Sequence, residues 1–154
     1  LSDRKRILRA LEVYLETGET ITEHNRKTQA VPPRYSPIWL GLDFAQRGEL
    51  YRRIDLRVSR MVEAGILQEA EWVWRNRDTF RTAAQAIGYK EYFPYFEGTQ
   101  TQAECTEKLK QATRNYAKRQ LTWFRNQNDA VWLYVDEDDV LAKATALVRD
   151  FLGK

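Results

Sequence analysis

The sequence is poor in cysteine and histidine, and this excludes several kinds of site. Its 154 residues include one cysteine, Cys105, and one histidine, His24. A single cysteine forms no disulfide within the chain and no thiolate metal cluster. A single histidine leaves no histidine-based zinc site and argues against a Ser-His-Asp triad. The residues therefore predict no metal site in this chain and no obvious general base.

Two phosphate-binding motifs and any long apolar run are also missing. The chain contains neither a G-x-x-x-x-G-K-[ST] phosphate loop nor a G-x-G-x-x-G turn. No apolar run approaches the length needed to cross a bilayer, which argues against a membrane protein. With 43% hydrophobic and 31% charged residues, the composition is that of a globular domain. Because the chain opens on Leu1 and a helix cap at Ser2 or Asp3, we expect a fragment of a longer protein.

The positive charge is concentrated in two segments. The net charge is only +3, but residues 1–9 and residues 104–125 are both rich in lysine and arginine. Two basic segments in one chain predict a polyanionic partner such as a nucleic acid. The alternative is that they form two solvated helix faces.

Apolar periodicity and capping residues predict a mainly helical chain with two short strands. Three prolines between Ala30 and Pro37 predict a loop. Gly65 separates two helices, and Pro94 is expected to end another. The predicted helices cover residues 3–17, 20–27, 46–64, 67–77, 82–93 and 101–126, and a last helix follows residues 136–139.

The strand candidates are two apolar runs, Ile38–Phe44 and Ala130–Val135. Both read as fully buried, which is typical of parallel strands covered by helices. Two such strands cannot form an independent sheet. They therefore predict that the remaining strands belong to another part of a larger α/β protein.

Arg57 interrupts the apolar stripe of the helix predicted over residues 46–64. At about 100° per residue, it lies roughly 20° from Leu50 on the helical wheel. An unpaired charge that faces a core is very costly, so this guanidinium needs an anion or water. It snorkels outward or pairs with a buried carboxylate, or it binds a phosphate or diphosphate, whose geometry suits arginine.

The helix predicted over residues 101–126 carries a basic ridge opposite an apolar stripe. Arg114, Lys118 and Arg125 form the ridge, because they fall within roughly 40° of one another. Such a ridge follows a nucleic-acid backbone or is a solvated face. Gln120 lies inside the stripe, where a neighbour or a ligand such as a base edge must satisfy its amide. The stripe consists of Cys105, Leu109, Ala112, Tyr116 and Trp123.

Gly88 lies inside the helix predicted over residues 82–93, where a glycine costs roughly 1 kcal/mol relative to alanine. We therefore expect another helix or a ligand to approach its backbone closely. An aromatic cluster surrounds Lys90 and either stacks on unpaired bases or belongs to the core. The cluster consists of Tyr89, Tyr92, Phe93, Tyr95 and Phe96.

Four stretches of the chain, taken together and in their order along the sequence, are typical of one protein family. They are Asp3–Val13 (DRKRILRALEV), Leu50–Val58 (LYRRIDLRV), Gln85–Glu91 (QAIGYKE) and Thr113–Arg125 (TRNYAKRQLTWFR). In this order they resemble the C-terminal half of the tRNA dimethylallyltransferase family, also called tRNA isopentenyltransferases or IPP transferases. The resemblance implies the C-terminal part of a P-loop NTPase-like α/β fold, with residues 1–30 as the end of a helical insertion and residues 31–154 as the rest of the core.

The resemblance also implies a reaction and its partners. Such enzymes transfer a dimethylallyl group from dimethylallyl diphosphate to the exocyclic N6 amine of adenosine-37, 3′ of the anticodon, in tRNA. The implied partners are a tRNA anticodon stem-loop and dimethylallyl diphosphate, and the implied cofactor is Mg²⁺, with ligands outside this chain. The resemblance further implies a cytoplasmic enzyme that is a monomer at full length and has no membrane partner.

By the same resemblance, Arg57 contacts the diphosphate and three segments contact tRNA. No catalytic residue falls in this chain, because the family's phosphate loop and general base belong to the N-terminal half. We therefore expect the chain alone to be inactive. The implied tRNA contacts are Lys5, Arg6, Ile7, Leu8 and Arg9; Gln85, Ala86, Ile87, Gly88, Tyr89 and Lys90; and Lys118, Arg119, Gln120, Leu121, Thr122, Trp123, Phe124 and Arg125.

Two other functions fit the residues. One is a non-catalytic basic helical RNA-binding module, and the other is a structural or protein-interaction domain whose basic ridge is only solvated. Salt-dependent binding to an anticodon stem-loop separates the latter from the RNA-binding alternatives. Loss of diphosphate binding in Arg57→Ala separates the transferase from the module.

Overall fold

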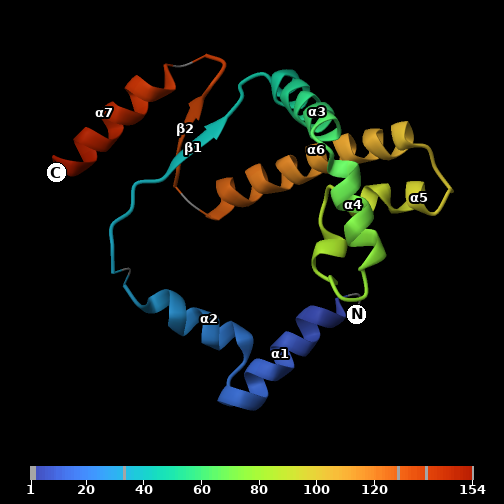
Figure 1. Cartoon of the computed structure of the whole chain (residues 1–154). Helices are drawn as coiled ribbons and strands as arrows, with labels where there is room; N and C mark the ends of the chain where they lie inside the picture. Colours follow the sequence, from blue (N-terminus) through green and yellow to red (C-terminus); the bar gives the residue numbers. More distant parts are fainter. Residues whose placement is uncertain (1–2, 33, 128, 138, 154) are drawn as a thin grey trace. The chain divides into compact units, whose positions relative to one another are not determined.

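The computed structural model describes residues 3–32, 34–127, 129–137 and 139–153 (Figure 1). The chain divides into two compact units, Leu1–Pro37 and Ile38–Lys154. Each unit has its own internal packing.

The first unit contains two helices with local stop and start signals. Helix α1 covers Arg4–Thr17; Asp3 accepts a hydrogen bond from the Arg6 N–H at its start, and Gly18 ends it at φ 72°. Helix α2 covers Ile21–Ala30 and begins with a reciprocal capping box between Thr20 and Glu23. Both predicted helices are confirmed, although α2 continues three residues beyond Lys27. The other candidate cap, Ser2, lies outside the described residues.

The second unit is built around three helices that pack on one core. Helices α3 (Arg47–Glu63) and α4 (Ile66–Arg75) are separated by Gly65, which adopts φ 100°. Helix α6 (Gln102–Gln127) lies against α3, and α7 (Val140–Leu152) is the last helix, as predicted (Figure 1). The buried residues that form this core are Val58, Ile66, Ala70, Tyr92, Cys105 and Leu109.

Strands β1 (Leu40–Asp43) and β2 (Val131–Tyr134) pair in parallel, so both strand predictions and their direction are confirmed. Gly41 lies opposite Trp132 in the register, and Asp43 lies opposite Tyr134. Their predicted full burial is wrong, because Leu42 is 60% exposed and Val131 is 43% exposed. Within the described residues this sheet has two strands, and such a narrow ribbon cannot cover its own side chains on both faces.

The segment over residues 82–93 is not the continuous helix that its apolar pattern predicts. It consists of two short 3₁₀ turns, η1 (Ala83–Gln85) and η2 (Lys90–Tyr92), with Gly88 between them at φ 116°. Pro94 does not end a helix but lies in the first turn of the short helix α5 (Phe93–Phe96). Both differences have a local cause, because glycine adopts positive φ without strain and proline needs no backbone donor in a first turn.

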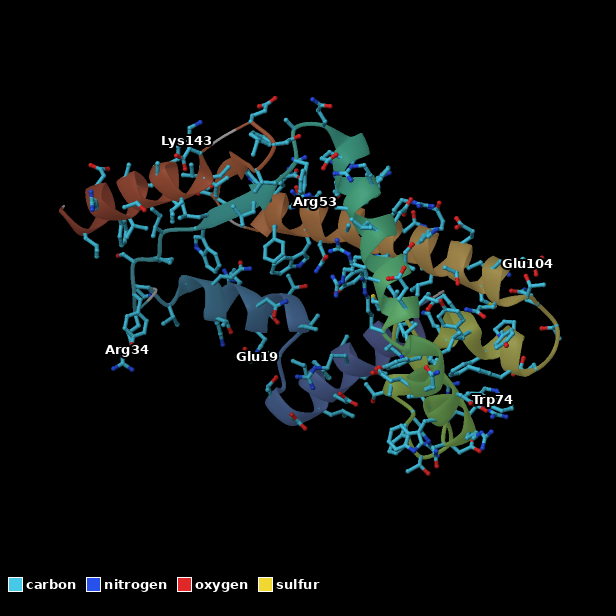
Figure 2. The ribbon with its side chains drawn as sticks, turned by 45° about the horizontal axis from the view of Figure 1, so that its top comes forward. Glu19, Arg34, Arg53, Trp74, Glu104 and Lys143 are labelled. Carbon is cyan, nitrogen blue, oxygen red and sulfur yellow. The ribbon has the colours of Figure 1, made fainter. Side chains whose placement is uncertain are left out.

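The predicted apolar stripe of α6 is buried only in its first half. Cys105 and Leu109 are buried, whereas Tyr116 is 46% exposed and Trp123 is 56% exposed. The start of α6 packs on α3 and on η2, and the later turns carry their apolar side chains on an open surface. Figure 2 shows side chains projecting along the whole length of this helix, beginning near Glu104.

Candidate substrate-binding cavity

An open cavity of about 800 Å³ lies between α3, α6 and the loop that contains η1. Its polar side chains include three cations and two amides. Its floor is apolar and includes core residues of α3 and α6. The lining residues are Leu50, Ile54, Arg57, Val58, Met61, Gln85, Ala86, Ile87, Lys90, Leu109, Thr113, Tyr116, Ala117, Arg119 and Gln120.

Arg57 reaches this cavity from the edge of the buried face of α3. Ile54 and Val58 on either side of it are buried, but Arg57 itself is exposed. The side chain therefore reaches solvent, as one of the predicted alternatives has it, and it opens onto a cavity that Leu50 and Met61 of the same apolar stripe also line. Among the described residues Arg57 forms no ion pair, so a pairing with a buried carboxylate is not observed. An unpaired guanidinium at an open cavity is suited to binding an anion.

The loop over residues 83–92 presents four of its predicted site residues to the cavity: Gln85, Ala86, Ile87 and Lys90. Its shape depends on Gly88, whose N–H donates to Glu91 Oε2 at 2.8 Å. The predicted close approach to the Gly88 backbone is wrong: the nearest atom to an added Cβ, Ile66 Cδ1 of α4, would lie at an ordinary contact distance of 3.7 Å, and it is the positive φ that favours glycine here.

Gly88 and Tyr89, the other two predicted residues of this loop, line a separate cavity of about 390 Å³ beside α4. The Tyr89 hydroxyl donates to Glu69 Oε2 at 3.2 Å. Burial, together with the nearby Glu69 carboxylate, raises the pKa of Tyr89. The tyrosine is therefore held against α4 as a neutral hydrogen-bond donor.

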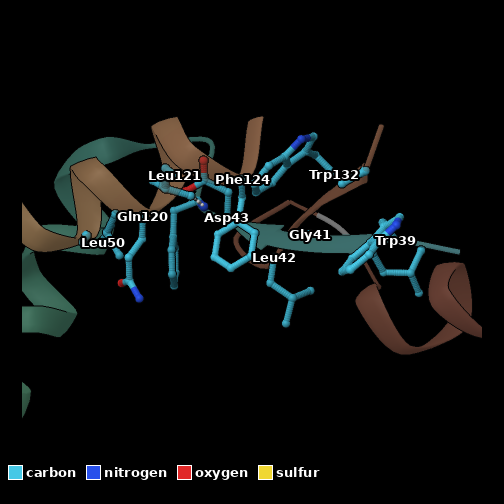
Figure 3. Close-up of a pocket in the computed structure, with 13 residues that line it drawn as sticks. Trp39, Gly41, Leu42, Asp43, Leu50, Gln120, Leu121, Phe124 and Trp132 are labelled. Carbon is cyan, nitrogen blue, oxygen red and sulfur yellow. Dashed lines mark hydrogen bonds between the residues drawn. The ribbon is translucent and has the colours of Figure 1, made fainter. Parts of the chain in front are cut away.

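The side chains of the predicted segment Lys118–Arg125 point in different directions, because the segment lies in helix α6. Arg119 and Gln120 line the cavity that contains Arg57. Leu121 and Phe124 line a neighbouring apolar cavity of about 450 Å³ beside β1 (Figure 3). Gln120 borders both cavities and is exposed, so its predicted burial in the stripe is wrong. The remaining members, Lys118, Thr122, Trp123 and Arg125, are exposed and line neither cavity.

The basic ridge of α6 is not an uninterrupted phosphate-binding surface. Arg114 Nη1 lies 2.6 Å from Asp55 Oδ1, and Arg125 Nη2 lies 2.7 Å from Asp43 Oδ2. Lys118 is the member of the ridge that forms no ion pair within the described residues. The helical wheel groups the three cations on one face of α6, but it contains no information about the carboxylates on α3 and β1 that pair with two of them.

The predicted tRNA contacts Lys5–Arg9 belong to the first unit. All five side chains are exposed on α1. Arg6 pairs with Asp3 at 3.1 Å, and Arg9 pairs with Glu12 at 3.3 Å. Both pairs are local and solvent-exposed.

Tyr116 lines the cavity, although the sequence pattern places it in the core stripe. Its ring is half-exposed, and the Arg119 guanidinium carbon lies 5.6 Å from the ring centre. The spacing of three residues between an aromatic and an arginine was the available signal. Within the predicted aromatic cluster, by contrast, Tyr92 belongs to the core: it is fully buried and hydrogen-bonds Thr106 Oγ1 at 3.0 Å.

The donor set of the cavity suits an anion rather than a divalent cation. Mg²⁺ prefers carboxylate and other oxygen ligands, whereas the charged residues that line this cavity are Arg57, Lys90 and Arg119. The described part of the chain holds no group of three or more His, Cys, Asp or Glu side chains placed to bind a metal. Nor does any described helix have the length and apolar character to cross a membrane.

A family model described as "IPP transferase" matches residues 1–127. The chain belongs to the IPP transferase family. The resemblance found in the four sequence stretches is therefore confirmed. The matched range contains every residue that lines the cavity.

The curated relatives in this family include tRNA dimethylallyltransferases. The protein of Lactobacillus johnsonii is 48% identical over 151 residues, which are 97% of this chain and 48% of the relative. The protein of Shouchella clausii is 43% identical over 149 residues, or 97% of this chain and 47% of the relative. The chain thus spans about half the length of the curated relatives that it matches.

Solved structures in the IPP transferase family share this fold. The tRNA Δ(2)-isopentenylpyrophosphate transferase of Staphylococcus epidermidis matches 98% of this chain and 49% of its own, with a TM-score of 0.71 and 33% identity. A eukaryotic dimethylallyltransferase, described as acting on tRNA, matches 98% of this chain and 41% of its own, with a TM-score of 0.80 and 26% identity. The mainly helical architecture with two parallel strands therefore matches a little under half of each of these two solved structures.

Proposed function

We propose that this chain forms part of a tRNA dimethylallyltransferase. The whole enzyme transfers a dimethylallyl group from dimethylallyl diphosphate to the N6 amine of adenosine-37, 3′ of the anticodon. The amine nitrogen attacks the allylic carbon, the carbon–oxygen bond to the diphosphate breaks, and the amine loses one proton to a base. The observation that carries the proposal is the unpaired Arg57 at an open cavity that also collects Lys90 and Arg119.

In this proposal the residues around the cavity have distinct roles. Arg57 binds the diphosphate, because a guanidinium forms two parallel hydrogen bonds to phosphate oxygens and neutralises the leaving group. Lys90 and Arg119 neutralise RNA phosphates. Gln85 and Gln120 carry amides that can both donate to and accept from the edges of an unpaired base.

We further propose that the 154 residues do not turn over alone. No carboxylate or imidazole belongs to the described residues that line the cavity, so none of them is placed to accept the amine proton. A general base, a phosphate loop and the protein ligands of Mg²⁺ would come from residues outside this chain. Residues 1–30 would end a helical insertion, and residues 31–154 would complete a P-loop NTPase-like core in a monomeric, cytoplasmic enzyme.

The test grafts this chain into the full-length Lactobacillus johnsonii relative in place of the matching segment. In the graft, Arg57→Gln should raise the KM for dimethylallyl diphosphate by about tenfold or more, since a charge-assisted contact is worth about 1.5 kcal/mol or more. The affinity for tRNA should change much less. Arg60→Gln is the matched control, because Arg60 lies one turn further along α3, is exposed and does not line the cavity.

Two outcomes would contradict the proposal. If Arg57→Gln weakens the use of dimethylallyl diphosphate and the affinity for tRNA equally, Arg57 is not the diphosphate contact. If the unsubstituted graft has no transferase activity, the proposed function is contradicted. An RNA-binding module without chemistry predicts an inactive graft that still binds the anticodon stem-loop. Incubation of the isolated chain with tRNA and labelled prenyl diphosphate tests its inactivity separately, and a modified tRNA product would overturn that part.

A further inference from the structure

Asp43, the last residue of β1, is a buried charged residue of this fold. Its side chain is only 2% exposed. One carboxylate oxygen, Oδ1, accepts the N–H of Phe44 at 2.8 Å, and the other, Oδ2, accepts from Arg125 Nη2 at 2.7 Å. Because an uncompensated buried carboxylate is strongly destabilising, Arg125 is required as its counter-ion.

Arg125 is also held on its other side by an aromatic ring. The Arg125 guanidinium carbon lies 5.2 Å from the ring centre of Trp132. Trp132 is the register partner of Gly41, and its ring covers that glycine so closely that an added Cβ would lie 2.7 Å from a ring carbon. The glycine thereby leaves room for the indole on the face of β1 that also carries Asp43, two residues further along the strand (Figure 3).

These contacts fix the last turns of α6 to the two-stranded ribbon. Arg125 lies five residues after Gln120, which is about one and a half turns of helix. A helix anchored there has a defined rotation about its axis. That rotation decides whether Arg119 and Gln120 point into the cavity that contains Arg57 or away from it.

We propose that Arg125, with Asp43 and Trp132, is a positioning residue that orients α6 for RNA binding and is not itself a phosphate contact. This assignment rests on the proposed function, in which Arg119 and Gln120 bind the RNA. It replaces the direct tRNA contact that the sequence resemblance implies for Arg125.

The chain provides a matched control in Lys118. Lys118 lies on the same ridge of α6, is exposed, and has no ion pair among the described residues. A cation that contacts a phosphate contributes to the salt dependence of binding, because its contact releases a counter-ion. A cation that is already paired with a protein carboxylate contributes little to that dependence.

The experiment measures the binding of an anticodon stem-loop to the 154-residue chain at several salt concentrations. Lys118→Gln should reduce the slope of log K against log salt by about 0.7–0.9. Arg125→Gln should weaken binding with the slope unchanged. A slope that falls in Arg125→Gln as it does in Lys118→Gln would overturn the positioning role.

A second measurement does not depend on RNA. Thermal unfolding of Arg125→Gln, Asp43→Asn and the double variant should show strong coupling, with Asp43→Asn recovering part of the stability and of the RNA affinity lost in Arg125→Gln. Additive losses would overturn the inference. If the unsubstituted chain fails to prefer the anticodon stem-loop over an unrelated hairpin, the proposed function fails, and the unfolding cycle still decides whether the ion pair anchors α6.

Discussion

Arg114 on α6 and Asp55 on α3 form an ion pair at 2.6 Å that spans 59 positions of the sequence. The Arg114 side chain is only 19% exposed, and Gln111 accepts a second hydrogen bond from it at 3.0 Å. This pair joins the two helices that form the walls of the cavity, two residues away from Arg57 on α3. The position of Arg57 relative to α6 therefore depends on the Arg114–Asp55 ion pair, although neither of these two residues is proposed to bind a substrate.

Arg114→Ala should destabilise the chain by about 1–2 kcal/mol, because a partly buried, charge-assisted hydrogen bond is lost. Urea unfolding measures the change. Arg52→Ala is the control: Arg52 pairs with Glu49 on the solvated surface of the same helix α3, and its removal should leave the unfolding midpoint close to that of the wild type. Equal shifts in the two variants would show that the link between α3 and α6 adds no stability.

Gly88→Ala should cost about 1–2 kcal/mol in stability, because φ near 116° strains any residue with a Cβ. The cost is strain rather than a clash, since the added Cβ would meet Ile66 Cδ1 only at 3.7 Å. Gly98→Ala is a matched control, because Gly98 has φ 71° and lies in a turn that does not line the cavity. Both variants should lose stability, but only Gly88→Ala should weaken anticodon stem-loop binding. If Gly88→Ala and Gly98→Ala bind the stem-loop equally well, the loop around Gly88 takes no part in RNA binding.

Tyr116→Ala should weaken the same RNA binding by about 1–3 kcal/mol, because an exposed ring beside a cation can stack on an unpaired base. Tyr116→Phe keeps the ring and should bind nearly as the wild type does. Tyr95→Ala serves as the comparison, since Tyr95 is similarly exposed but its ring packs on Phe96 away from the cavity. Filter binding at fixed salt measures all three, and a large loss in Tyr116→Phe would point to the hydroxyl instead of stacking.

Acid should weaken the contact between the segment after β2 and the turn that links β1 to α3. The Asp136 carboxylate accepts the N–H groups of Gln46 and Ala45, at 3.0 and 2.8 Å, and these bonds hold the pKa of Asp136 below its ordinary value of 3.8. A carboxyl group whose pKa is lowered by folding stabilises the protein above its unfolded pKa, and this contribution is lost as the pH falls through the folded pKa.

Stability measured by urea unfolding should therefore decline from about pH 5 downward, and Asp136→Asn should flatten that decline. Glu97→Gln changes an exposed carboxylate whose side chain forms no hydrogen bond or ion pair within the described residues, and this variant should follow the wild-type curve. A decline of equal steepness in Asp136→Asn would assign the acid sensitivity to other carboxylates.

Much of the local structure follows from residues close together in the chain. The capping box at Thr20 and Glu23, the cap at Asp3 and the break at Gly65 each act within three or four residues, and each predicted helix boundary nearby is confirmed within a few positions. The two strands were recognisable from their apolar runs. The loop around Gly88 was not, because apolar spacing alone does not distinguish a helix from two tight turns.

In the candidate site, too, some features follow from the sequence and others only from the packing of distant elements. The sequence by itself determined that Arg57, the segment from Gln85 to Lys90 and the segment from Lys118 to Arg125 carry unusual chemistry. Only the tertiary structure decided that Arg57 opens onto a cavity, that Arg119 faces it, and that Arg125 is committed to Asp43, 82 positions earlier. A helical wheel orders side chains around one axis, whereas the partner of a charge is decided by which other element packs against that axis.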